Sequence, residues 1–118
     1  MKNMQWKIAL SKECSTWLQA LPLDARVSLV NALRAITKTT TGPWEVKTKD
    51  IEITRLPSES PALYKMIVLR VTPTTGIVYG LVGDWIVPVL WGVLPSPMPQ
   101  AMLKIAHEAI ETFKRSKS

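Results

Sequence analysis

The stretch GIVYGLVGDWIVPVLWGV, residues 76–93, decides the fold. Its residues follow a period of two on both sides of Gly83 and Asp84, a pair typical of a tight β-hairpin turn. We therefore expect two antiparallel strands, over residues 76–82 and 85–93. Pro88 lacks a backbone N–H, so it should lie at an edge position or at a β-bulge of the second strand.

Further strands are expected upstream of this hairpin. Residues 51–56 and 63–71 keep the period of two. The turn-rich segment SESP separates them, and TPTT separates the second of them from the hairpin. Gaps this short favour an antiparallel meander. Residues 5–10, QWKIAL, alternate in part and predict a short first strand.

Helical spacing appears in three segments. Ser11 is a candidate N-cap for a helix over residues 12–21, and Asp24 for a second helix that together with the first should form a hairpin. A final amphipathic helix should follow Pro99. The sequence thus predicts an α+β fold with the order β-α-α-β-β-β-β-α, in which an N-terminal helical hairpin and a C-terminal helix pack an antiparallel sheet. At 118 residues we expect a single domain, residues 1–118.

Charge is distributed unevenly along the chain. Lysine and arginine number 15 against 9 acidic residues, for a net charge of +6, which favours a polyanionic partner such as nucleic acid. Yet no charged side chain occurs from Trp85 to Leu103. Four prolines, at positions 88, 95, 97 and 99, argue against a membrane-spanning helix in that run. With no signal-peptide pattern either, we expect a soluble cytoplasmic protein.

Neither metal nor cofactor chemistry is expected. Cys14 and His107 are the only cysteine and histidine, too few ligands of the usual kinds for a metal site. They lie far apart in the sequence with no orienting motif, so we expect Cys14 to pack as an apolar thiol and not to act as a nucleophile.

An ordered series of short motifs resembles the RelE/HigB group of bacterial toxin endoribonucleases. The opening WKIALSKECSTWLQALPLDARVSLVNALRAI is similar to the family's first strand and helical hairpin. LYKMIVLRV at 63–71 and GIVYG at 76–80 resemble its Leu-Tyr-Glu-Leu-Arg and Arg-x-x-Tyr strands. In VLWGVLPSPMPQAMLKIAHEAIETF, Pro99 and Ala106 keep the family's proline-to-alanine spacing at the start of the last helix.

The resemblance implies cleavage of ribosome-bound mRNA without a metal, and neutralisation by a small antitoxin, typically a helix-turn-helix protein. Such cleavage needs a base, a proton donor and cations for the charge that develops on phosphate oxygens. This chain departs from the family at the catalytic positions. Lys65 stands for the family's Glu, Ile67 and Gly76 for its arginines, Leu94 and Pro95 for the paired lysines, and Phe113 for the terminal Tyr. We therefore expect an activity that is reduced or lost.

The remaining candidates for catalysis are Lys65, which is preferred, and Arg70. By the two-residue period these two point to opposite faces of their strand. Candidates for nucleic-acid binding are Lys47, Lys49, Arg55, Tyr64 and Tyr79. The cations also suit protection of a sheet edge, and the tyrosines also suit half-buried packing.

Two alternatives share the scaffold. Trp85 and Trp91, with Val93 and Leu94, could form an apolar patch that binds a protein, which would make the chain a non-catalytic binding module. A toxin directed at DNA gyrase is the other alternative, because a fold alone does not determine function.

Overall fold

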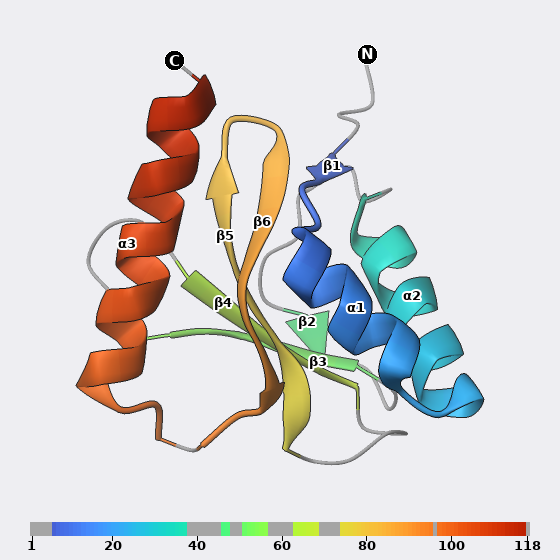
Figure 1. Ribbon diagram of the computed structural model, residues 1–118. Helices are drawn as coiled ribbons and strands as arrows, with labels where there is room; N and C mark the ends of the chain where they lie inside the picture. Colours follow the sequence, from blue (N-terminus) through green and yellow to red (C-terminus); the bar gives the residue numbers. More distant parts are fainter. Residues whose placement is uncertain are drawn as a thin grey trace.

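The computed structural model describes residues 6–37, 46–47, 51–56, 63–68, 74–95 and 97–117 (Figure 1). Three helices flank one sheet, so the fold is α+β as predicted. The helices are α1 (Lys12–Ala20), α2 (Leu23–Thr37) and α3 (Gln100–Lys117). The strands are β1 (Lys7–Ile8), β2 (Val46–Lys47), β3 (Ile51–Arg55), β4 (Leu63–Val68), β5 (Thr75–Val82) and β6 (Trp85–Val93). The two-residue strand β2 adds one element to the predicted order.

The six strands lie in the order β1-β6-β5-β4-β3-β2. Consecutive strands from β2 to β6 pair antiparallel, as the short gaps predicted, but β1 pairs parallel with β6. The prediction of a wholly antiparallel sheet was therefore wrong. The connection from β1 onward contains α1 and α2 and is no hairpin, so it does not constrain β1 to run antiparallel to its neighbour.

The hairpin that decides the fold forms as expected. Val82 pairs with Trp85 across the turn, and Gly83 adopts φ of 59°, a backbone region that glycine reaches without a Cβ penalty. Pro88 lies both at an edge position and at a β-bulge, the two alternatives predicted for it. The register with β5 shifts beside it, so that Val89 is an extra, bulged residue, and β1 accompanies β6 only as far as Ile86.

The starts of both helices of the hairpin follow from local chemistry. The Ser11 hydroxyl accepts a hydrogen bond of 3.1 Å from the backbone N–H of Cys14, which confirms the predicted N-cap of α1. Asp24 is not the cap of α2, because that helix begins one residue earlier and the Pro22 carbonyl accepts from the Arg26 N–H. The Asp24 carboxylate lies instead in the first turn, where the helix dipole favours it.

Alternation along the strands divides the core into two clusters, one on each face of the sheet. Tyr64, Met66 and Val68 of β4 pack toward α1 and α2, among Leu18, Leu29, Leu33 and Ile36. Leu63 and Ile67 pack toward α3, among Leu103, Ala106 and Ile110. The sheet face that carries Leu63 and Ile67 is thus partly covered by α3 (Figure 1).

Candidate functional site

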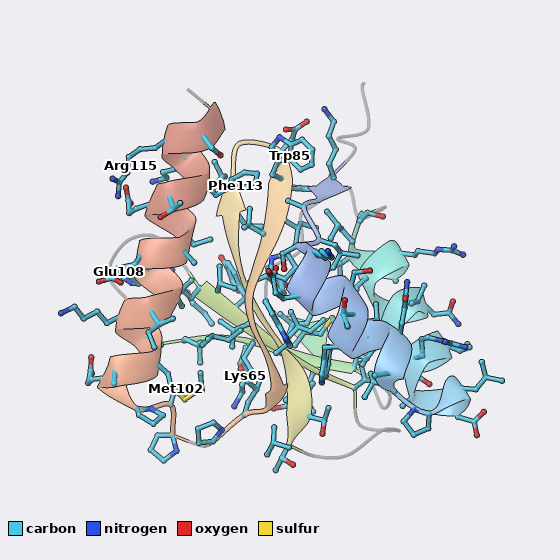
Figure 2. All side chains as sticks on the ribbon, viewed as in Figure 1. Lys65, Trp85, Met102, Glu108, Phe113 and Arg115 are labelled. Carbon is cyan, nitrogen blue, oxygen red and sulfur yellow. The ribbon has the colours of Figure 1, made fainter. Side chains whose placement is uncertain are left out.

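Lys65 lies on the sheet face that α3 covers. Leu63 and Ile67, two positions before and after it on β4, belong to the apolar cluster on that face. Its cross-strand partners are Thr54 and Val78. Figure 2 shows its side chain on the side of the sheet where Met102 and the start of α3 lie. The side chain is half-buried, and no hydrogen bond or ion pair joins it to another residue of the described segments. Glu52 pairs with Ile67 and so lies on the same face, diagonal to Lys65, but no ion pair joins the two. Among the described residues, Lys65 is therefore a half-buried cation with both apolar and polar neighbours.

The two tyrosines lie on the opposite face. Tyr64 and Tyr79 pair across β4 and β5, stack with ring centroids 5.7 Å apart and are buried beneath α1 and α2. Burial raises the pKa of the Tyr79 phenol well above its usual range, and the neighbouring Tyr64 raises it further. A nucleobase could stack on either ring only if the helical hairpin moved. The placement of the two tyrosines therefore favours a role in packing.

Among the described side chains, none of the other candidate residues lies beside Lys65. Arg55 ends β3, is exposed and pairs in register with Tyr64. Lys47 is opposite Glu52 in the β2–β3 register. Lys49 and Arg70 lie outside the described residues, so their predicted roles remain predictions.

Substituted positions of the family motif carry structural side chains in this chain. Ile67 and Leu94 are buried in the cluster on the α3 side. Phe113 contacts Trp85 edge to face, with ring centroids 6.0 Å apart, in the second half of α3 (Figure 2). These residues can neither accept a proton nor neutralise an oxyanion.

Gly76 has no room for a side chain. A Cβ built there would overlap the backbone carbonyl oxygen of Met66 and lie 2.7 Å from Cδ1 of Ile67. An arginine could therefore not occupy this position without moving β4 away from β5. In this chain the position therefore serves the close packing of β4 against β5.

A second feature, which the sequence analysis missed, is an open groove of about 550 Å³ between α3 and β6. Val87, Pro88 and Val89 form its floor, and its walls come from residues 8–11 on one side and from α3 on the other. Trp85 and Phe113 close one end, where the Lys7 ammonium lies 5.3 Å from the centre of the Trp85 ring. None of the lining side chains is charged; those not yet named are Ile8, Ala9, Leu10, Ser11, Ala109, Thr112 and Ser116.

A sequence signal for this groove existed. The uncharged run from Trp85 onward supplies the floor, and one flank of α3, with Ala109, Thr112 and Ser116 at three- and four-residue spacing, is also uncharged. The other wall, residues 8–11, begins in β1 and continues to α1, and the parallel pairing of β1 with β6 brings it to this place.

Within the described segments, no three His, Cys, Asp or Glu side chains gather where they could hold a metal ion. No helix found there is both long enough and apolar enough to cross a lipid bilayer.

Cys14 is fully buried in α1, and burial raises the pKa of its thiol to about 11. Because the thiolate is the reactive form, we expect native protein at pH 8 to react with Ellman's reagent at least about 100-fold more slowly than protein unfolded in guanidinium chloride. Stopped-flow absorbance of the two samples measures this ratio. Equal rates would mean that the thiol is accessible and would contradict its place in the core.

No model of a protein family matches the chain, and no curated protein sequence and no solved structure matches it either.

Proposed function

We propose that this chain is a toxin-fold component of a bacterial toxin–antitoxin pair, built on a RelE/HigB-like scaffold, in which ribosome-dependent mRNA cleavage is reduced or lost. The order of elements and the ordered motifs support the scaffold, and the net charge of +6 is compatible with it. In this proposal the chain acts mainly by binding its partner, a small antitoxin.

The single observation that carries the loss of cleavage is that no second cation is paired with Lys65 across the described strands. Attack of a 2′-hydroxyl on the adjacent phosphate requires proton transfer and stabilisation of an oxyanion, and loss of one preorganised donor costs about 10²- to 10³-fold in rate. Among the described sheet residues on the α3 side, Lys65 has Leu63, Ile67, Thr54 and Val78 around it, with the Glu52 carboxylate diagonal to it. One amine and one carboxylate cannot replace the several groups that the reaction requires.

A growth experiment tests this proposal. The chain is induced alone and together with the product of the adjacent reading frame, and the same is done for Lys65→Ala. We expect Lys65→Ala to behave like the parent chain, because no second cation is paired with Lys65 across the described strands. We expect the adjacent product to bind the chain in a co-purification. A neighbour that fails to bind, together with normal growth on induction, would refute membership of a toxin–antitoxin pair.

The uncharged groove beside β6 favours the second candidate, a non-catalytic protein-binding module on the same scaffold. This function predicts normal growth on induction together with tight binding of a protein. A toxin-fold chain that has lost cleavage also leaves growth normal, so the identity of the partner separates the two candidates: the pair requires binding to the product of the adjacent reading frame, and the module does not.

A further inference from the structure

In the described part of the sheet, no strand pairs with the outer edge of β6 beyond Ile86. β1 pairs with β6 only at Trp85 and Ile86, and in the described sheet no other strand lies on that side. Beyond Ile86 the chain that follows β1 forms a wall of the groove, and Pro88 and Val89 lie in its floor. Pro88, which has no N–H, and the bulge at Val89 interrupt hydrogen bonding along this edge. A segment bound here would therefore lie on the apolar floor and contact the hydroxyl groups of the walls, without extending the sheet.

The hydroxyl groups along the groove retain hydrogen-bonding capacity of both kinds. Thr112 and Ser116 donate their protons to the carbonyls of Glu108 and Phe113, at 2.9 Å each, so their oxygens remain acceptors. The Ser11 oxygen accepts from Cys14, so its proton remains a donor. A peptide backbone, which alternates N–H and C=O groups, matches this arrangement of acceptors and donor.

Charge selects among the possible occupants. A nucleic acid would place phosphates against a lining that contains no cation, and a second copy of this chain would bring another +6 to a surface of the same sign. An acidic protein is attracted by the net charge. The part of it that enters the groove must be uncharged, because a charge buried there would lose its hydration without an ion pair.

We infer that the groove between α3 and β6 binds an extended, uncharged and largely apolar segment of an acidic partner protein. The inference rests on the proposed function in so far as the partner of the pair is the natural source of this segment. A volume of about 550 Å³ lies in the range of pockets that enclose compact ligands, so it accommodates a few residues of such a segment.

Selection of random dodecapeptides displayed on phage against the immobilised full chain tests the inference without knowledge of the partner. We expect enriched peptides to carry apolar residues at alternate positions, with acidic residues only at their ends. Synthesised with a fluorophore, these peptides should bind Ala109→Arg and Thr112→Arg about tenfold or more weakly than the parent chain. Each substitution places a cation in the groove. The matched control is Asn31→Arg, which adds the same charge to an exposed site on α2 and should leave affinity unchanged.

Circular dichroism melts of the three variants verify that each is folded. Peptides that bind Thr112→Arg as well as the parent chain would overturn the inference, and so would a failure to enrich any sequence. A dimer seen by sedimentation velocity and broken by Thr112→Arg would overturn it in favour of a second copy as the occupant.

The outcome is separable from that of the proposed function. If the adjacent product binds the parent chain and Thr112→Arg equally well, the inference fails while the toxin–antitoxin pair stands. If groove-dependent peptides are selected but the adjacent product does not bind and induction is harmless, the pair fails and the groove stands.

Discussion

Gly76→Arg, which introduces the arginine found at this place in the RelE/HigB motif, should unfold the protein. Even Gly76→Ala places its Cβ on the Met66 carbonyl oxygen and 2.7 Å from Cδ1 of Ile67. Overpacking of this kind costs about 3 kcal/mol when the obstacle is backbone, and the far larger arginine should exceed the stability of a small domain. Urea unfolding of Gly76→Ala and far-ultraviolet circular dichroism of Gly76→Arg measure these effects.

The matched control is Gly83→Asn in the hairpin turn. Nothing lies within 4 Å of a Cβ at Gly83, and asparagine tolerates its φ of 59°, so the free energy of unfolding should change by less than about 1 kcal/mol. A Gly76→Arg protein that folds as stably as the parent chain would show that β4 and β5 do not pack as described.

Ile110→Ala should weaken the attachment of α3 to the sheet. Ile110 is fully buried, and Gly80 is opposite it without a Cβ, since one placed there would be 2.5 Å from Cδ1 of Ile110. Removing a buried isoleucine side chain to alanine costs about 2–5 kcal/mol, and Gly80 has no side chain with which to fill the space. We expect this loss in the free energy of unfolding measured by urea titration.

Ile105→Ala provides the control on the same helix. Ile105 is 54% exposed, so its truncation should change stability by no more than about 0.5 kcal/mol. If Ile105→Ala were the more destabilising of the two, α3 would have to be rotated relative to the face assigned here.

The hairpin and the meander could be predicted because their information is local. Gly83 and Asp84 specify a turn by backbone geometry, the period of two specifies strands, and Ser11 specifies a helix start through one hydrogen bond. The direction of β1 could not be predicted in this way, since it depends on where α1 and α2 return the chain. The start of α2 lies two residues before the predicted one, because the Pro22 carbonyl already accepts the first helical hydrogen bond, from the Arg26 N–H.

The candidate site was predictable only in part, for a similar reason. Alternation along β4 placed Lys65 and Tyr64 on opposite faces, but it did not show which face each helix covers. The burial of Tyr64 and Tyr79 beneath the helical hairpin, and the groove shared by residues 8–11 and α3, both depend on contacts between distant segments. A uniform lack of charge marked the groove along the sequence, while its shape needed the fold.

The central proposal is that the sheet face around Lys65, where the described strands pair no second cation with it, does not cleave a phosphodiester. Primer extension on a defined mRNA, translated by purified ribosomes with the chain in excess, tests it most directly. We expect no cut above the background given by ribosomes alone, and the same pattern for the parent chain and Lys65→Ala. Specific cuts in the ribosome-bound message that appear with the parent chain and vanish with Lys65→Ala would contradict the claim.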